Sequence, residues 1–157
     1  MNIALAKLWR DECLANHSLC GLGSPDPELA PLPTRLLDVT NPEKPVLKEI
    51  PSGTTGTYVA LSYCWGQVTQ LETTRGNYLS HKRGILSSRL PQTIRDAVSV
   101  ANWLGYKHIW IDALCIIQDD DSDMRRELDK MGDIYRYAAL TISAQRAASS
   151  HGGLFNK

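Results

Sequence analysis

The stretch "YVALSYCWG", residues 58–66, ends an apolar run with side chains that can contact a ligand. The hydroxyl groups of Ser62 and Tyr63 can form hydrogen bonds, and the indole of Trp65 offers a flat face for stacking. Gly66 has no side chain, so the backbone there can come close to a bound molecule. We therefore expect this stretch to contribute to a ligand-binding site.

The elements that position these residues follow an α/β pattern from Tyr58 onward. Short apolar runs predict strands within Tyr58–Tyr63, Lys107–Leu114 and Ala138–Ala144. Amphipathic patterns predict helices within Leu90–Tyr106 and Asp119–Ala138. Strands that alternate with helices are typical of a parallel sheet buried on both faces. The predicted fold class is therefore α/β, with a parallel sheet flanked by helices.

Ligands of such sheets collect where the parallel strands end, at their carboxyl edge. The first predicted strand brings Ser62, Tyr63, Trp65 and Gly66 to this edge. The second predicted strand and the segment after it bring three further polar residues to the same edge: Asp112, Gln118 and Asp119. We expect all of these residues to line one binding site.

Residues 1–57 predict an N-terminal adjunct to this core. Residues 3–20 have a helical pattern, and residues 21–33 form a connector because their prolines and glycines break regular structure. Two apolar runs, Thr34–Val39 and Val46–Ile50, predict a β-hairpin. A chain of 157 residues with 43% hydrophobic content is large enough for one globular domain, in which this adjunct packs on a core of residues 58–157.

Charge, hydropathy and cysteine content exclude several classes of protein. The 17 basic and 17 acidic residues balance, so no overall charge attracts nucleic acid or an anionic membrane. The apolar stretches are far shorter than the roughly 20 residues of a membrane span, and no secretory signal opens the chain. We expect an intracellular protein that neither binds nucleic acid nor spans a membrane, with its four cysteines reduced or bound to metal.

Two groups of residues raise the question of a metal site. Cys13, His17 and Cys20 would share one helical face and could hold zinc with a fourth ligand, but none is evident. Small thiols also pack in a core beside an aromatic residue such as Trp9, and we favour that reading. The acidic stretch Gln118–Asp123 favours capping of the next helix over a Mg²⁺ or Ca²⁺ site.

Residues 75–95 form a basic segment without an acidic residue. Its cations are Arg75, Lys82, Arg83, Arg89 and Arg95. These side chains could face a phosphate, form a solvated surface, or pair with the acidic residues of 119–133 in a second copy of the chain.

Two blocks, "YVALSYCWG" and Leu90–Ala144 with "WIDALCIIQ" at residues 110–118, resemble the fungal heterokaryon incompatibility (HET) family. The preceding "LPTRLLDV" is similar to the segment before these blocks in that family. The resemblance implies a fungal, cytoplasmic protein that triggers programmed cell death when genetically different hyphae fuse, through self-association or other incompatibility proteins. The chain ends soon after its last predicted strand, which fits a truncated chain, a fragment or a short family member.

The stretch "ALSY", residues 60–63, also resembles the start of Toll/interleukin-1 receptor (TIR) domains, a flavodoxin-like fold proposed as a remote relative of the HET family. TIR domains that cleave NAD have an essential glutamate early in a helix after a central strand. The resemblance implies that Glu127 is the catalytic residue, that NAD is the substrate, and that no cofactor is required. Met124–Arg126 stand where the TIR motif has a Trp-Cys pair, which departs from the pattern.

The chemistry of Glu127 has two readings. Cleavage of a ribosyl–nicotinamide bond passes through an oxocarbenium-like state that a carboxylate can stabilise. A helical projection places Glu127 at the edge of the apolar stripe, partly buried, where it could point into a cleft. Arg126 or Lys130 could instead pair with it on a solvated helix face. The alternative function is a death-signalling interaction module that self-associates and has no chemistry of its own.

Overall fold

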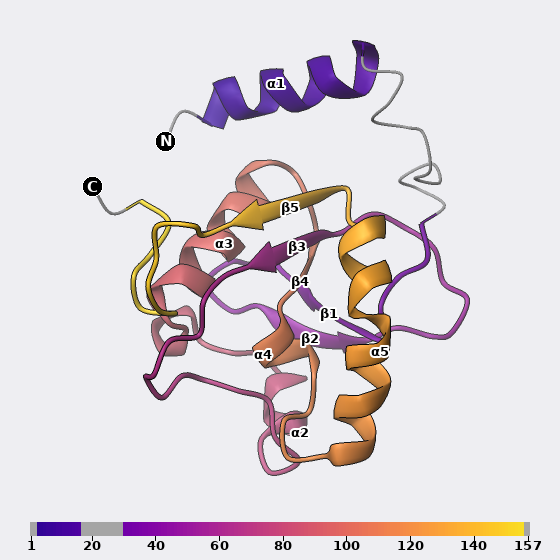
Figure 1. Cartoon of the computed structure of the whole chain (residues 1–157), viewed down its shortest axis with the longest axis vertical. Coiled ribbons are helices and arrows are strands. Elements are labelled where there is room, and N and C mark those ends of the chain that lie inside the picture. Colours follow the sequence, from indigo (N-terminus) through magenta and orange to yellow (C-terminus); the bar gives the residue numbers. More distant parts are fainter. Residues whose placement is uncertain (1–2, 17–29, 156–157) are drawn as a thin grey trace.

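One five-stranded sheet organises the part of the chain that follows the connector (Figure 1). The computed structural model describes residues 3–16 and 30–155. The strands are β1 (Arg35–Asp38), β2 (Val46–Glu49), β3 (Val59–Ser62), β4 (His108–Trp110) and β5 (Leu140–Ser143). Their order across the sheet is β2-β1-β4-β3-β5. The predicted α/β class is therefore confirmed.

The three strands expected to be parallel are parallel. β3 lies between β4 and β5, and Val59 is in register with Ile109 on one side and with Leu140 on the other. Val59, Ala60 and Leu61 are buried, because this central strand is covered on both faces. The carboxyl ends of β3, β4 and β5 consequently meet at one edge of the sheet.

The hairpin belongs to this sheet, which makes the sheet mixed. β1 pairs antiparallel with β2 and also antiparallel with β4, so that Leu37 is in register with both Leu47 and Ile109. The expectation of a purely parallel sheet with a hairpin packed beside it is wrong. The physical reason is that β1 is buried, with Leu36 and Leu37 completely inaccessible, and a buried strand satisfies its backbone by pairing on both edges.

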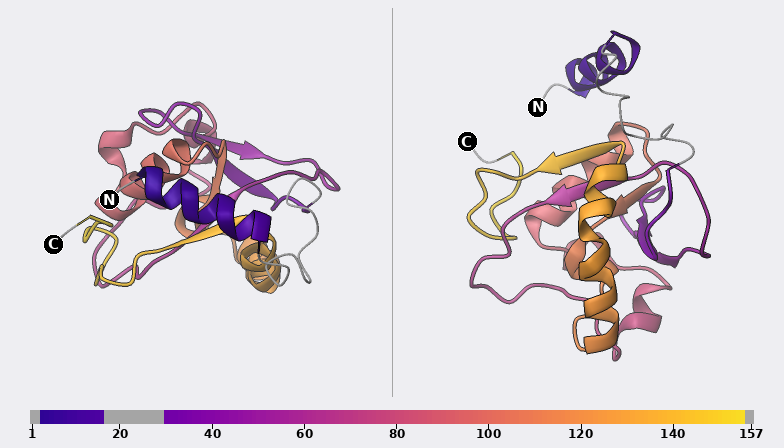
Figure 2. Two further views of the ribbon diagram at one scale, coloured as in Figure 1. Left: turned by 90° about the horizontal axis from the view of Figure 1, so that it is seen from above. Right: turned by 45° about the vertical axis from the view of Figure 1, so that its right-hand side comes forward.

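Two long helices cover opposite faces of the sheet. α3 connects β3 to β4, whereas α5 connects β4 to β5 on the other side of β3, so the two connections run in opposite directions across the sheet. Connections between parallel strands are right-handed as a general rule. The two helices therefore lie on opposite faces of the sheet (Figure 2). The helices are α1 (Ile3–Asn16), α2 (Tyr78–His81), α3 (Gln92–Trp103), α4 (Asp112–Cys115) and α5 (Asp121–Tyr137), with a 3₁₀ turn η2 (Ser87–Arg89). Within residues 3–16 and 30–155, no helix is long and apolar enough to cross a membrane.

The second predicted strand is shorter than expected. It ends at Trp110, and the following residues form α4, a single helical turn that starts at Asp112. The apolar run continues through this turn because Ala113, Leu114 and Cys115 are also buried. An apolar run alone does not distinguish a buried strand from a buried helical turn.

The acidic stretch before α5 caps that helix, as predicted. The Asp120 side chain accepts hydrogen bonds from the backbone N–H groups of Ser122 and Asp123, each at 3.1 Å. These bonds satisfy donors that the first turn of a helix leaves without a partner. The Ser122 hydroxyl and these N–H groups hold the pKa of Asp120 well below its usual range.

Arg10 connects helix α1 to the end of α3 and the residues that follow it. Arg10 donates a hydrogen bond to the carbonyl oxygen of Leu104 at 2.7 Å, and its guanidinium lies 5.8 Å from the centre of the Tyr106 ring. Leu8 and Trp9 on the same helix are exposed. The predicted helix of residues 3–20 is confirmed as far as Asn16, and its last four residues lie outside the described part of the chain.

Candidate functional site

The predicted strand-end residues Trp65 and Asp112 are in direct contact. The indole Nε1 of Trp65 donates a hydrogen bond to Oδ2 of Asp112 at 2.8 Å, although 47 residues separate them. The backbone N–H of Ala113 donates to Oδ1 of Asp112 at 2.7 Å. The loop after β3 and the start of α4 are thus joined at the carboxyl edge of the sheet, and both side chains stay partly exposed.

Tyr63 lies in the same cluster and connects it to the next loop. Its hydroxyl donates to Oε1 of Gln70 at 3.2 Å. Burial raises the pKa of Tyr63, and the nearby carboxylate of Asp112 raises it further, so the phenol keeps the proton that it donates to Gln70. We call Tyr63, Trp65, Gln70 and Asp112 the strand-end cluster.

Asp112 is the carboxyl group with altered acidity in this cluster. Burial raises its pKa, and the hydrogen bonds from Trp65 and Ala113 offset only part of that effect. A carboxyl group with a raised pKa, beside a neutral phenol and an indole, can exchange a proton with a ligand more readily than an ordinary aspartate near neutral pH.

This raised pKa predicts a pH-dependent stability. The folded state binds the proton of Asp112 more tightly than the unfolded state, whose aspartate pKa is about 3.9. The stabilising contribution of Asp112 is therefore complete below that value and is lost as the pH rises through the folded-state pKa. Urea unfolding at about pH 4 and about pH 7 should show that wild type loses stability relative to Asp112→Asn as the pH rises. Asp129→Asn, which changes an exposed acid, serves as the control. If the stability difference between wild type and Asp112→Asn were the same at both pH values, the raised pKa of Asp112 would be contradicted.

Gln118 lies beside Asp112, whereas Asp119 contacts the loop that contains Arg75. The side-chain amide of Gln118 donates to the carbonyl oxygens of Asp112 at 3.1 Å and Ile116 at 3.2 Å. Oδ1 of Asp119 accepts a hydrogen bond from the backbone N–H of Arg75 at 2.7 Å. Both side chains shape the edge of the site by positioning its loops.

Ser62 and Gly66 contact the C-terminal segment of the chain. The carbonyl oxygen of Ser62 accepts from the N–H of Ala144 at 2.9 Å, and Ser62 is in register with Ser143 of β5. Gly66 has a φ of +74°, and a Cβ atom there would lie 2.5 Å from Cβ of Ser149. Glycine is required at this position because the C-terminal segment of the chain approaches it closely, and the predicted approach to a ligand stays a prediction.

An ion-pair network that the sequence did not reveal lies beneath the start of α5. Arg35 of β1 donates to the carboxylate of Asp123 and, at 2.6 Å, to the carbonyl oxygen of Cys115. Arg126 donates to the same carboxylate, and the N–H of Ile117 donates to it at 2.9 Å. The Arg35 and Asp123 side chains are 4% and 3% exposed. The only sequence signal was a charged residue at the start of an apolar strand.

Comparison with known proteins decides the family. The family described as heterokaryon incompatibility protein (HET) matches residues 58–157, which is more than half of the chain. The chain belongs to the HET family. "Heterokaryon incompatibility protein 6, OR allele" from Neurospora crassa is 30% identical over 92 residues, which are 54% of this chain and 14% of that relative. No solved structure matches the chain significantly.

The part of the chain that matches the HET family contains the whole strand-end cluster. Residues 58–157 supply Tyr63, Trp65, Gln70 and Asp112, as well as α5. Arg35, which pairs with Asp123 of the matched part, comes from the hairpin that precedes it. The hairpin therefore contributes a buried charge to the HET domain.

Glu127 of the HET domain is more buried than predicted. Its side chain is 0% exposed, with Oε1 at 3.4 Å from Nε of Arg126 and 3.9 Å from Nζ of Lys130. Oε2 is buried without a hydrogen-bond partner among the described residues. The expectation that Glu127 lies at a partly buried boundary is wrong, and no hydrogen bond within the described residues connects it to the strand-end cluster.

The buried face of α5 explains this placement. It contains Asp123, Glu127 and Ile134, whereas Leu128 of the predicted apolar stripe is 51% exposed. The ion pair of Asp123 with Arg35 holds that aspartate inside, and Glu127 follows one turn later on the same face. Met124, Met131 and Tyr135 of the stripe still pack against the core, so the buried pair and most of the apolar stripe face the same way.

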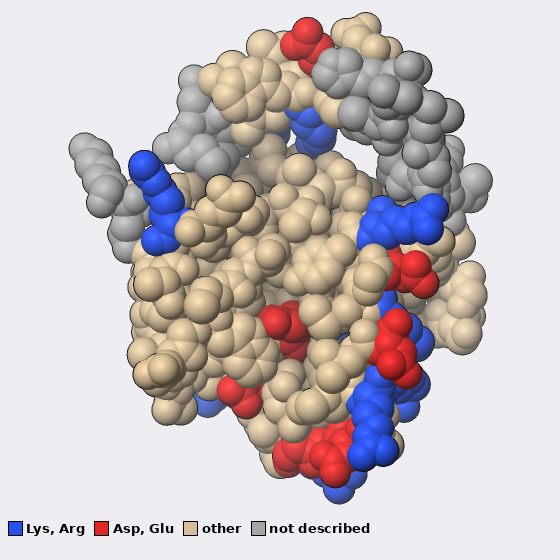
Figure 3. All heavy atoms as spheres, viewed as in Figure 1, with Lys and Arg blue, Asp and Glu red and all other residues tan. Residues whose placement is uncertain are grey.

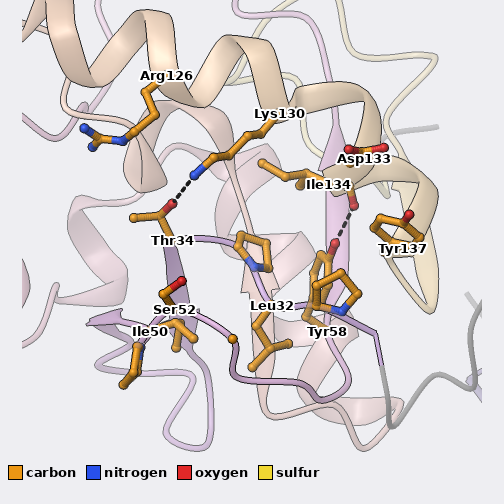
Figure 4. A pocket seen from close by; sticks show the side chains of 14 residues that line it. Leu32, Thr34, Ile50, Ser52, Tyr58, Arg126, Lys130, Asp133, Ile134 and Tyr137 are labelled. Carbon is orange, nitrogen blue, oxygen red and sulfur yellow. Dashed lines mark hydrogen bonds between the residues drawn. The ribbon is translucent and has the colours of Figure 1, made fainter.

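A pocket of about 480 Å³ lies at the opposite end of β3 (Figure 4). It is bounded by α5 and by the segments before β1 and after β2. Lys130 reaches across it to Oγ1 of Thr34 at 3.2 Å, and the hydroxyl of Tyr58 donates to the carbonyl oxygen of Ile134 at 2.6 Å. None of the predicted binding residues lines this pocket, so it is separate from the strand-end cluster.

Charged side chains gather along α5. In Figure 3, acidic and basic side chains alternate along this helix, with acidic ones grouped near its start, while the face over β5 is mostly uncharged. The acidic residues predicted to pair with a second copy are thus mixed with cations of the same helix, including Arg126 and Lys130.

The predicted zinc set is only partly described. Cys13 lies half-buried in α1, whereas His17 and Cys20 lie outside the described residues. Within residues 3–16 and 30–155, no group of three cysteine, histidine, aspartate or glutamate side chains is placed to hold a metal ion. Zinc binding by Cys13, His17 and Cys20 stays a prediction.

Proposed function

We propose that this chain is a cytoplasmic effector of programmed cell death in heterokaryon incompatibility and that its strand-end cluster binds a nucleotide. The match of residues 58–157 to the HET family carries this proposal. The name of the Neurospora crassa relative supports it. The cluster offers the groups that a nucleotide uses: the partly exposed indole of Trp65 for stacking, and the polar groups of Tyr63 and Asp112 for hydrogen bonds.

The finer proposal is that the nucleotide is NAD and that Glu127 promotes its hydrolysis. The bond between ribose and nicotinamide breaks, nicotinamide leaves with the bonding electrons, and water adds to the ribosyl carbon. The carboxylate of Glu127 stabilises the positive charge that develops on the sugar. This role requires Glu127 to reach the substrate, and its 0% exposure means that α5 has to move first. The resemblance to TIR domains supports this proposal, because Glu127 matches their essential glutamate in residue type and in its place in a helix after a central strand.

A second candidate function is an interaction module without chemistry. The burial of Glu127 favours it, because a side chain with no access to solvent has no access to a substrate. In this case the HET domain signals by self-association or by binding other incompatibility proteins. The exposed side chains of Leu8 and Trp9 on α1 provide apolar surface for such contacts.

Nicotinamide release from NAD distinguishes the two candidates. We expect purified chain to release nicotinamide, more strongly at higher protein concentration, and Glu127→Gln to lose this activity. The variant has nearly the same volume and keeps an oxygen that can accept from Nε of Arg126, and circular dichroism checks that it is folded. Asp129→Asn, an exposed acid on the same helix, is the matched control. Undiminished release by folded Glu127→Gln would refute the catalytic role, and no release at any concentration would favour the interaction module.

A further inference from the structure

A second pocket, of about 440 Å³, lies beside the strand-end cluster. The loop after β3, the η2 turn, the start of α3 and the C-terminal segment form its wall. Its polar lining includes Gln70, Arg89, Gln92, Arg95 and His151, and none of its lining residues is acidic. We call it the arginine pocket. It is large enough for a small-molecule ligand.

The two arginines of this pocket have no carboxylate partner in the described part of the chain. Neither Arg89 nor Arg95 forms a salt bridge within residues 3–16 and 30–155, whereas Arg35, Arg75 and Arg126 each do. Arg95 donates to the side-chain oxygen of Gln92, a neutral group. Arginine presents a planar fork of donors that matches a phosphate or carboxylate group. The pocket therefore has positive charge that no acid of the described chain neutralises at contact distance.

The side-chain amide of Gln70 is a buried hydrogen-bond donor that has no acceptor among the described residues. Its Oε1 accepts the hydrogen bond of Tyr63, while its Nε2 is buried and has no partner among the described residues. A buried donor without a partner costs free energy, which an acceptor from a ligand in the pocket would recover. The same side chain belongs to the strand-end cluster and lines the arginine pocket, so the two sites are continuous.

The start of α3 also contributes positive electrostatic potential to the pocket. This helix has 12 residues, its first residue Gln92 lines the pocket, and Pro91 before it provides no side-chain cap. The N–H of Thr93 is already used by the carbonyl oxygen of Ser150 at 2.9 Å. The positive end of the helix dipole nevertheless adds to the field of the two arginines.

We propose that the arginine pocket binds the phosphate groups of a nucleotide. The choice of a nucleotide rests on the proposed function. The positive charge of the pocket specifies that the phosphate groups of the nucleotide bind there. Phosphate oxygens accept from Arg89, Arg95 and the amide of Gln70. The N–H of Ser150, next to His151 of the pocket, donates to the carbonyl oxygen of Trp65 at 3.3 Å, so the backbone of Trp65 lies beside the segment that lines the pocket.

Calorimetric titration of the full chain with ADP-ribose and with inorganic pyrophosphate tests the inference. We expect both probes to bind and ADP-ribose to bind more tightly, because only ADP-ribose also offers a base and sugars to the strand-end cluster. The double variant Arg89→Gln/Arg95→Gln should weaken both by about tenfold or more, because each lost contact is a charge-assisted hydrogen bond. Arg83→Gln, an exposed arginine of the same basic segment outside the pocket, should bind like wild type.

The outcomes separate this inference from the proposed catalysis. Binding that the double variant leaves unchanged, or no binding of either probe, overturns the arginine pocket even if NAD is cleaved. Equal affinities for the two probes would indicate a site for an ion and overturn its assignment to a nucleotide. Arginine-dependent binding without nicotinamide release supports the pocket and removes the catalytic proposal. Circular dichroism of the double variant checks that it is folded.

Discussion

Replacing Asp123 by alanine is expected to lower the free energy of unfolding by about 3–5 kcal/mol. The change leaves the guanidinium of Arg35 buried at 4% exposure without its carboxylate. It also removes the acceptor of the Ile117 N–H. Chemical unfolding of wild type and variant, followed by circular dichroism, measures the difference. Because the pair joins β1 to α5, its loss should weaken the packing of the hairpin against the helix.

Two variants on the same helix calibrate this expectation. Asp121→Ala changes an exposed acid in the first turn of α5 and should cost well under about 1 kcal/mol. Arg126→Ala removes the half-exposed partner of Asp123 and of Glu127 but leaves Arg35 in place beside Asp123, so it should cost less than Asp123→Ala. An Asp123→Ala variant as stable as these two would show that the buried pair does not hold α5 on the sheet.

Gly66→Ala is expected to lower the free energy of unfolding by about 2–5 kcal/mol, as the sum of backbone strain and overpacking. A φ of +74° is unfavourable for alanine, and its Cβ would lie 2.5 Å from Cβ and 3.0 Å from Cα of Ser149. The C-terminal segment would have to move away, which breaks the hydrogen bond from Ser150 to Trp65. Urea unfolding measures the loss, and weaker ADP-ribose binding should accompany it.

Gly105→Ala separates the two contributions. Gly105 also has a positive φ, +90°, but nothing lies within 4 Å of a Cβ atom there. Its substitution should therefore cost only the backbone part, about 1–2 kcal/mol. Equal losses at Gly66 and Gly105 would show that the close contact with Ser149 contributes nothing.

The local elements of this fold were predictable because their patterns are regular. α3 has an apolar stripe of Ile94, Ala97, Val98 and Ala101, all buried, and its period of 3.6 residues specifies a helix. The parallel strands were found because short apolar runs alternate with helices. The pairing of β1 with β4 was missed, because edge-to-edge pairing between strands 70 residues apart leaves no local pattern.

The candidate site was predictable to a similar extent. The rule that ligands bind at the carboxyl ends of parallel strands brought Trp65 and Asp112 to one place, and their hydrogen bond confirms that they meet. Gln70 was missed because a glutamine in a loop has no distinctive spacing. The arginine pocket was foreseen only as a basic segment that could face a phosphate, because which cations share a cavity depends on tertiary structure.

The central claim is that a HET domain triggers cell death through its strand-end cluster. The most direct test is to measure the growth of Neurospora crassa strains that express this chain. We expect wild type to arrest growth and Trp65→Ala, expressed at the same level, to permit it. Trp103→Ala, which changes another partly exposed tryptophan at the end of α3, should still arrest growth. Arrest by Trp65→Ala equal to that of wild type, or no arrest by wild type, would contradict the claim.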